Sequence, residues 1–235
     1  MSNYITIWRK TLENFSIAID GPASAGKSTI AKKVASHLGF IYLDTGAMYR
    51  SLTYAALKAE LVLEDEAALV SLLNTIEITF SYEGDQQKVF VNGEDVTDRI
   101  REKDVTQNVS LVSSHEKVRA EMVARQQHIA ETGEIVMDGR DIGTVVLPAA
   151  DLKVFLIASA EERALRRYKE SIDKGMSVSL EQLTKELIER DHYDSNRTAS
   201  PLKKAEDAVE LDSTHLTIEQ VVEEVLRLAK ERLKN

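Results

Sequence analysis

The stretch from Gly21 to Thr29 combines glycine, lysine and hydroxyl residues in an order suited to binding the phosphates of a nucleotide. It matches the phosphate-loop pattern G-x-x-x-x-G-K-[ST] and lies between a short apolar run and an amphipathic stretch. The glycines let backbone N–H groups converge on phosphate oxygens, and the start of the next helix adds partial positive charge there. We therefore expect a purine-nucleoside triphosphate to be bound by Gly21, Pro22, Ala23, Ser24, Ala25, Gly26, Lys27, Ser28 and Thr29.

Two side chains of this loop carry the expected chemistry, and a carboxylate from elsewhere in the chain should assist them. Lys27 supplies a full positive charge toward the β- and γ-phosphates, and the hydroxyl of Ser28 is placed to bind Mg²⁺. The apolar run at 134–138 ends in Asp138, which we expect to support the same Mg²⁺ through a water. Asp44, which closes the run at 40–44, is the alternative, although an aspartate at a strand end is also a common helix cap.

Arginines recur where predicted strands end and predicted helices begin. Guanidinium groups at such places suit two tasks, holding a second phosphate-bearing substrate and neutralising a phosphoryl group during its transfer. A surface ion pair is the alternative for each of them, above all for the i, i+4, i+7 set on one predicted helix face. The candidate arginines are Arg50, Arg140, Arg163, Arg166, Arg167, Arg190 and Arg197. Two aspartates accompany them, Asp141 directly after Arg140 and Asp194 between Arg190 and Arg197.

Short apolar runs alternate with amphipathic stretches, and this alternation predicts the elements that position these side chains. Strands that alternate with helices indicate a parallel α/β sheet with helices on both faces. The helices should begin at capping boxes such as Ser159/Glu162, Ser179/Gln182 and Thr217/Gln220. The five predicted strands are the runs at 16–20, 40–44, 134–138, 153–158 and 208–212.

One stretch departs from this alternation. Residues 76–82 alternate strictly between apolar and polar, a second apolar run follows at 88–91, and an Asn-Gly turn comes next. This pattern predicts a small antiparallel sheet inserted into the α/β core, roughly at 72–105. An insert near a site commonly adds substrate contacts or a lid, and a merely decorative hairpin is the alternative.

Composition limits the classes of partner. The 235 residues carry 30 Lys+Arg against 39 Asp+Glu, a net charge of -9, which argues against nucleic acid polymers and anionic membranes. The absence of cysteine excludes a disulfide scaffold and thiol catalysis, and it suits a cytoplasmic protein. No apolar run reaches the ~18 residues that a membrane span requires. The charged outer face of the last predicted helix favours a monomer.

Taken together, these motifs resemble those of the bacterial cytidylate kinases, the CMP/dCMP kinases of the nucleoside-monophosphate kinase family. The matching segments are IAIDGPASAGKST, YLDTGAMYR, VNGEDVTDRIR, DGRDIGTVV, SAEERALRR and ERDHYDSNR. The resemblance runs from about Ser16 to the C-terminus, which leaves 1–15 as an N-terminal extension. It implies a five-stranded parallel P-loop kinase core formed by 16–71 and 106–235, with a short helical lid at about 160–175. Residues 72–105 would then be an inserted monophosphate-binding β domain.

The resemblance also implies a reaction, the transfer of the γ-phosphoryl of ATP to CMP or dCMP with Mg²⁺. Catalytic roles would fall to Lys27, Arg140, Arg163 and Arg166. Thr45 would lie near the monophosphate, Tyr49 would pack on the pyrimidine, and Arg50, Arg140 and Arg197 would hold the phosphate. The cytosine edge would be read by Ser110, Arg119 and Asp141, and the ribose hydroxyls by Arg190 and Asp194. Ser113 and Ser114 are rivals to Ser110 because they share its surroundings.

Two other functions are compatible with a phosphate loop. A P-loop kinase that acts on a hydroxyl, as shikimate kinases do, would need a carboxylate base beside the acceptor. A P-loop ATPase or nucleotide switch would bind no second nucleotide, and the set of arginines argues against it. A GTPase is disfavoured because the sequence has no N-K-x-D guanine-reading motif.

Overall fold

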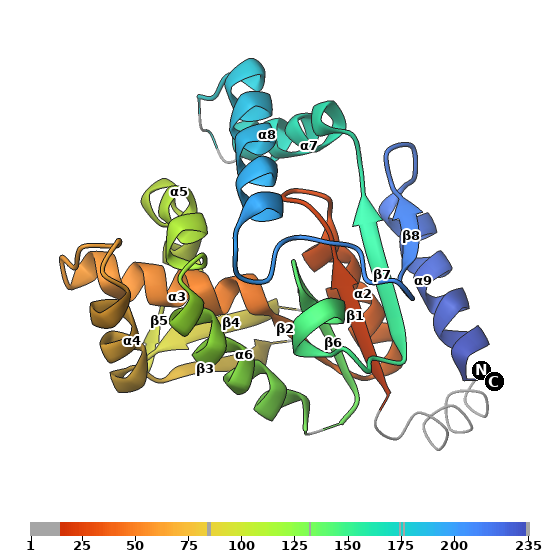
Figure 1. Ribbon diagram of the computed structural model, residues 1–235. Helices are drawn as coiled ribbons and strands as arrows, with labels where there is room; N and C mark the ends of the chain where they lie inside the picture. Colours follow the sequence, from red (N-terminus) through yellow and green to blue (C-terminus); the bar gives the residue numbers. More distant parts are fainter. Residues whose placement is uncertain (1–14, 84–85, 132, 174, 176, 234–235) are drawn as a thin grey trace. The chain divides into compact units, whose positions relative to one another are not determined.

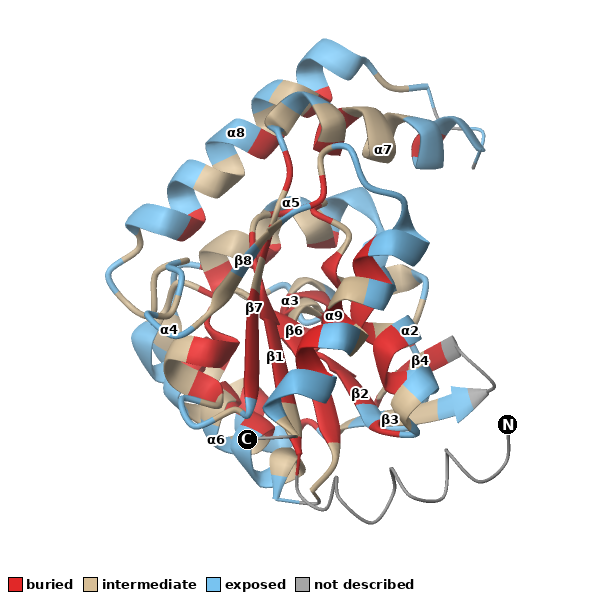
Figure 2. Ribbon diagram, turned by 90° about the vertical axis from the view of Figure 1, so that its right-hand side faces the viewer, coloured by how far each residue is buried: buried red, intermediate tan, exposed pale blue. Residues whose placement is uncertain are grey.

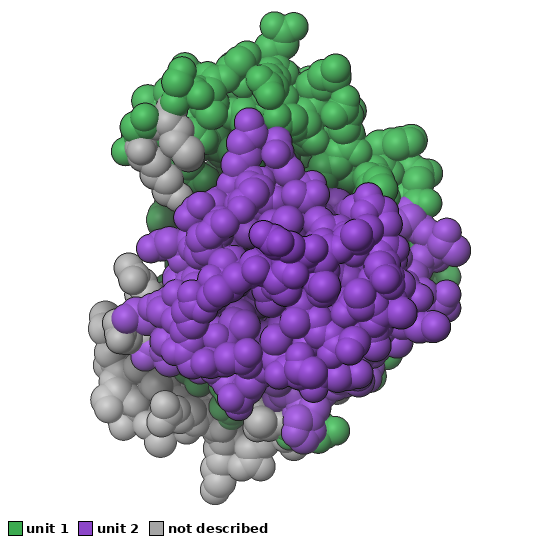
Figure 3. Space-filling view, turned by 90° about the vertical axis from the view of Figure 1, so that its left-hand side faces the viewer, with its two compact units in different colours: residues 1–43, 130–196, 200–235 green, residues 44–129, 197–199 purple. Residues whose placement is uncertain are grey.

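The computed structural model describes residues 15–83, 86–131, 133–173, 175 and 177–233. The chain divides into two compact units, coloured separately in Figure 3. Unit 1 is formed by 1–43, 130–196 and 200–235, and unit 2 by 44–129 and 197–199. The predicted N-terminal extension lies outside the described residues except for Phe15, which is buried.

Unit 1 is built on a five-stranded sheet whose strand order is β2-β6-β1-β7-β8 (Figure 1). The bounds are β1 (Ser16–Asp20), β2 (Ile41–Asp44), β6 (Ile135–Gly139), β7 (Leu152–Ile157) and β8 (Val209–Asp212). The pairings of β1 with β6 and β7, and of β7 with β8, are parallel. The five predicted strands are therefore confirmed to within about two residues at each end. The central strands are buried, as Figure 2 shows, because both of their faces are covered.

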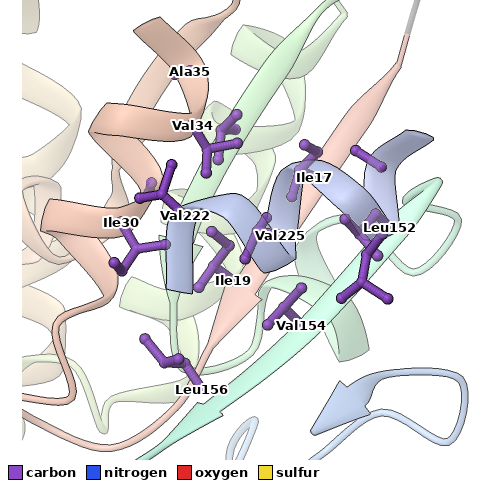
Figure 4. Packing of buried hydrophobic residues seen from close by; sticks show 14 of the residues in the cluster. Ile17, Ile19, Ile30, Val34, Ala35, Leu152, Val154, Leu156, Val222 and Val225 are labelled. Atoms are coloured by element: carbon purple, nitrogen blue, oxygen red, sulfur yellow. The ribbon is translucent and has the colours of Figure 1, made fainter. Parts of the chain in front are cut away.

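Two helices pack together on the sheet of unit 1, α2 (Lys27–Leu38) and α9 (Ile218–Arg232). Their apolar side chains form one buried cluster with those of β1 and β7 (Figure 4). Helix α2 ends at Gly39, which adopts a left-handed φ of 75° and donates its N–H to Ala35 O. Helix α9 begins with a full capping box formed by Thr217 and Gln220. The labelled members of the cluster are Ile17, Ile19, Ile30, Val34, Ala35, Leu152, Val154, Leu156, Val222 and Val225.

Two further helices of unit 1, α7 (Ala160–Asp173) and α8 (Leu180–Asn196), pack against each other. The hydroxyls of Ser159 and Ser179 accept bonds from the backbone three residues on, as the predicted capping boxes require. The prediction that Arg197 continues the face of this helix is wrong, because α8 ends at Asn196. The chain turns there as the Leu202 N–H bonds to Asp194 O at 2.9 Å, and Pro201 cannot extend a helix.

Unit 2 contains the small antiparallel sheet, with strand order β3-β4-β5 and an Asn92-Gly93 turn in left-handed conformation. Its strands are β3 (Ile78–Glu83), β4 (Gln86–Val91) and β5 (Glu94–Asp95). The helices are α3 (Thr45–Lys58), α4 (Glu66–Thr75), the short η1 (Arg99–Arg101), α5 (Lys103–Val112) and nearly all of α6 (Glu116–Ala130). The sheet lies within the predicted insert 72–105, and the compact unit around it is larger.

No helix in the described part of the chain is both long and apolar enough to cross a membrane.

Replacement of Gly21 by alanine should destabilise the protein by about 3 kcal/mol or more. Gly21 has a φ of 150°, and a Cβ there would overlap the carbonyl oxygen of Leu156 in β7. That oxygen belongs to the main chain, so it cannot move away without distorting the strand. Gly93→Ala is the matched control, because its φ of 80° is also unusual but nothing lies within 4 Å of the added carbon. That variant should lose only about 1 kcal/mol. Urea unfolding followed by circular dichroism measures both, and equal losses would show that strain in φ, not overlap with Leu156, dominates.

Candidate active site

The predicted phosphate loop folds as a turn between β1 and α2. Ser24 and Gly26 both adopt left-handed φ values, 59° and 90°, and α2 begins directly after Gly26. The N-terminus of α2 therefore opens at the loop, where its unpaired N–H groups suit an anion. Lys27 is 5% exposed, and its Nζ donates to Pro22 O at 2.6 Å, so its charge is held at the loop. A Cβ on Gly26 would lie 3.9 Å from Arg166 Nη1, which places a second cation nearby.

The electrostatic surroundings of Lys27 favour the binding of a negatively charged ligand. Burial in the first place, and then the charge of Arg140, lower the pKa of Lys27 to about 7. Asp138 and Asp20 oppose this shift, and Arg190 adds to it. A bound phosphate would provide the missing negative charge and favour protonated Lys27.

The hydroxyl and carboxylate predicted to support Mg²⁺ lie together. Ser28 Oγ donates to Asp138 Oδ2 at 2.9 Å, and Tyr42 Oη donates to Asp138 Oδ1 at 2.7 Å. These are hard oxygen groups, and Mg²⁺ commonly takes one or two of them together with waters and phosphate oxygens. The donor set therefore fits Mg²⁺.

Asp44, the alternative acidic group, has other partners. It caps α3 by accepting from the Ala47 N–H at 2.8 Å, and it pairs with Arg50 at 2.7 Å and Arg101 at 3.5 Å. Burial alone would raise the pKa of Asp44, but Arg50 and Arg101 outweigh it and the pKa is lowered. These contacts favour Asp138 over Asp44 as the magnesium-supporting group.

A third strand-end carboxylate, Asp20, organises the segment that follows β6. Its two oxygens accept from the backbone N–H groups of Ile142 at 2.8 Å and Gly143 at 2.7 Å. Burial raises the pKa of Asp20 to about 6, against the lowering effect of these two N–H groups. The short helix at Ile142–Val146 is thus tied to the end of β1, and Arg140 and Asp141 lie in the two positions before it.

The predicted arginines of unit 1 are largely engaged with protein groups. Arg140 Nε donates to Asp194 Oδ2 at 2.9 Å, so two predicted substrate residues are brought together. Arg163 is 5% exposed and donates to two backbone carbonyls. Arg166 pairs with Glu162 at 3.0 Å and bonds to Ser213 O at 2.7 Å. Arg167 and Arg190 lie on α7 and α8, respectively.

Several of the predicted substrate-binding residues lie in unit 2, where they contact one another or neighbouring side chains. The guanidinium of Arg119 lies 5.3 Å from the ring centre of Tyr49, a cation–π arrangement, and both residues are buried. Arg50 is paired with Asp44, while its Nε is buried with no hydrogen-bond partner among the described residues, leaving a donor for an anion. Thr45 is the buried first residue of α3.

The three serines considered for the cytosine edge lie at the end of α5, with Ser110 in the helix and Ser113 and Ser114 just after it. The hydroxyls of Ser113 and Ser114 donate back to carbonyls of their own turn, at 3.2 Å to Ser110 O and 2.7 Å to Leu111 O. Arg119 Nη1 in turn donates to Ser113 O at 3.0 Å. The choice among Ser110, Ser113 and Ser114 therefore stays a prediction. Arg197, counted with unit 2, follows α8 in an irregular segment.

The loop, its lysine and the paired Ser28 and Asp138 are features of a phosphoryl-transfer site, and comparison with known proteins decides which kind. The sequence profile of the family described as cytidylate kinase matches residues 17–231. The chain belongs to the cytidylate kinase family. The resemblance drawn from the motifs is thereby confirmed, and so is the fold class, a five-stranded parallel P-loop kinase core with a separate small antiparallel sheet.

Relatives cover nearly the whole chain. A cytidylate kinase of Ligilactobacillus salivarius is 58% identical over 221 residues, which are 94% of this chain and 99% of that protein. One of Bacillus cytotoxicus is 56% identical over 222 residues, with coverage of 94% and 99%. A solved structure of an uncharacterised protein from Eubacterium ventriosum aligns with a TM-score of 0.51 at 10% identity, covering 93% of this chain and 99% of that one. This last similarity is one of fold alone.

Three residues of this cytidylate kinase family member were not among the sequence candidates. Asp20 holds the segment after β6, Arg101 pairs with Asp44, and Asp191 contacts the phosphate loop. Asp20 could have been noticed, because it ends a strand as Asp44 does. Arg101 and Asp191 carry no such signal, since their partners are far away in the sequence.

Proposed function

We propose that this chain transfers the γ-phosphoryl group of ATP to CMP or dCMP, giving ADP and CDP or dCDP. The observation that carries the proposal is the family match over residues 17–231. The predicted site roles other than the catalytic role of Arg163, the domain bounds and the expectation of a monomeric cytoplasmic protein without nucleic acid or membrane partners are parts of the same proposal. The guanidinium of Arg163 is bonded to Ala158 O, Ala23 O and Asp191, so a structural role suits it better.

The reaction follows from what the residues of the loop can do. An oxygen of the CMP phosphate attacks the γ-phosphorus in line, and the bond from that phosphorus to the β–γ bridging oxygen breaks, so ADP leaves. A phosphate monoester is largely ionised at neutral pH, with a second pKa of ~6, so no dedicated base is required. Lys27 and the loop N–H groups neutralise the β- and γ-phosphates, and Arg140 and Arg166 provide further positive charge.

Ser28 would hold Mg²⁺ directly and Asp138 would hold it through a water, and the metal would neutralise phosphate charge. Their contact at 2.9 Å supports this assignment. Ser28 is the first residue after Lys27 in α2, so the helix that orients the lysine also orients the hydroxyl.

Base selection is proposed to depend on Asp141, Ser110 and Arg119. Cytosine presents an exocyclic amine where uracil presents a carbonyl, so a carboxylate accepts a bond from the first and repels the second. Asp141 is 4% exposed, which makes an unpaired uracil carbonyl beside it costly. Arg50, Arg140 and Arg197 would hold the monophosphate, and Arg190 and Asp194 the ribose.

A panel of nucleoside monophosphates tests the proposed function. Coupled measurement of ADP release should show turnover with CMP and dCMP that exceeds turnover with UMP or AMP by at least about 100-fold in kcat/KM. Shikimate and gluconate serve as hydroxyl acceptors in the same assay and should give no ADP above background. Slow ADP release that is independent of CMP would instead indicate a simple ATPase, and equal rates with CMP and UMP would contradict the role of Asp141.

A further inference from the structure

Ala23, in the phosphate loop, is bonded both to α7, which lies in the predicted lid, and to α8, which follows it. Its side chain is 3% exposed and packs with Ala164 of α7 and Leu187 of α8. Its backbone N–H donates to Asp191 Oδ1 at 3.2 Å, and its carbonyl oxygen accepts from Arg163 Nη1 at 2.9 Å. One loop residue therefore meets α7 and α8 through its side chain and both of its backbone polar groups.

The two side chains that hold Ala23 also hold each other. Arg163 Nη1 lies 2.6 Å from Asp191 Oδ2, and the two side chains are 6% and 20% exposed. Arg163 Nε donates to Ala158 O at 2.9 Å, so the guanidinium joins two backbone carbonyls and one carboxylate. A charge-assisted contact in such a buried place is stronger than a pair in open solvent. Ala23, Asp191 and Arg163 thus form a closed set of contacts between the loop and α8.

Helix α8 carries proposed substrate residues immediately beside Asp191. Arg190 precedes it, and Asp194 lies three positions later and is bonded to Arg140 at 2.9 Å. Any change in the position of α8 relative to the loop would therefore change where Arg190 and Asp194 lie. A change in the order of the loop would reach them through the contact at Ala23.

On the basis of the proposed function, we propose that Asp191, with Arg163, is a positioning residue that couples occupancy of the ATP loop to the CMP-binding residues of α8. Phosphates bound to the loop N–H groups restrict Ala23, and the contacts of Asp191 and Arg163 transfer that restriction to α8. CMP then binds a helix that is already ordered, so ATP tightens CMP binding and CMP tightens ATP binding by the same factor. Arg163 acts in this scheme by holding structure, without touching the transferred group.

The coupling factor is the readout, and it is the Kd of CMP alone divided by its Kd with saturating magnesium AMP-PNP, both measured by calorimetry. Asp191→Asn keeps an amide oxygen for the Ala23 N–H and loses the charge that faces Arg163. We expect the wild-type coupling factor to lie in the range typical of coupled sites, about 5- to 150-fold, and this variant to lower it toward one. Glu189→Gln is the matched control, since it removes one negative charge from α8 where the pair with Lys185 is exposed and 3.8 Å long. It should stay within about twofold of the wild type.

Arg163→Lys provides an independent variant in case Asp191→Asn does not fold. Lysine keeps the positive charge and loses the planar fork that reaches Ala23, Ala158 and Asp191 together, so the coupling factor should again fall. A wild-type factor of one, or a full factor in a folded variant, would overturn the inference. Turnover of CMP by the wild type is measured in parallel, because absence of turnover refutes the proposed function, whereas normal turnover with unchanged coupling refutes only the role of Asp191.

Discussion

Lys27→Ala should lower kcat for transfer to CMP by about 1,000-fold or more while leaving the protein folded. The side chain is 5% exposed and its Nζ is held at the loop by Pro22 O at 2.6 Å. Its charge is proposed to act on the β- and γ-phosphates, and removal of one such preorganised group commonly reduces kcat by about 10²- to 10³-fold. The full charge of a lysine puts the expected loss at the upper end.

Lys33→Ala is the control for this experiment. Lys33 lies on the same helix, but it is exposed and its contact with Glu219 spans 3.7 Å, so kcat should stay within about twofold of wild type. Rapid-quench measurement of the chemical step, together with thermal unfolding, separates a catalytic loss from a folding defect. A Lys27→Ala enzyme with an unaltered chemical step would remove the phosphate-loop assignment.

Asp141→Ala should lower kcat/KM for CMP by about 100-fold and leave the KM for ATP within about twofold. A hydrogen bond to a charged group contributes about 1.5–3 kcal/mol, which is about 10- to 150-fold in rate, and the buried position of Asp141 favours the upper part of that range. The loss should be specific to cytosine, because the carboxylate is proposed to accept from the exocyclic amine alone.

UMP serves as the internal control for Asp141. In Asp141→Ala the ratio of kcat/KM between CMP and UMP should fall toward one, since the group that repels the uracil carbonyl is gone. Asp141→Asn should go further and raise the rate with UMP, because its amide nitrogen can donate to that carbonyl. Equal losses with both nucleotides would indicate that Asp141 supports the segment structurally and does not read the base.

Most of the secondary structure could be predicted because its signals are local. Strand β1 ends at the residue expected from its apolar run, and the capping signals at Thr217 and Gly39 mark helix ends through bonds to residues within four positions. The end of α8 was missed for the opposite reason. The helical spacing of Arg190, Asp194 and Arg197 continues past the point where the Leu202 N–H takes the carbonyl of Asp194.

The chemistry of the loop was also determined by the sequence alone. A phosphate cradle is made of consecutive residues, so glycines at Gly21 and Gly26 and the Lys27–Ser28 pair specify it directly. The family could be recognised from several such motifs in a fixed order. Each motif consists of residues adjacent in the sequence, so it can be identified without knowledge of the tertiary structure.

Only the tertiary structure decided what connects these motifs. Asp20 bonds to Ile142 across 122 positions, and Ala23 bonds to Arg163 across 140 and to Asp191 across 168. The contacts of Asp20 and Arg163 exist because β6 and β7 flank β1 in the sheet, and the contact of Asp191 exists because α8 packs on α7. Neither the strand order nor this helix packing is encoded by a local pattern. The sequence by itself therefore determined which groups could bind phosphate, and the fold decided which of them are held in place by distant partners.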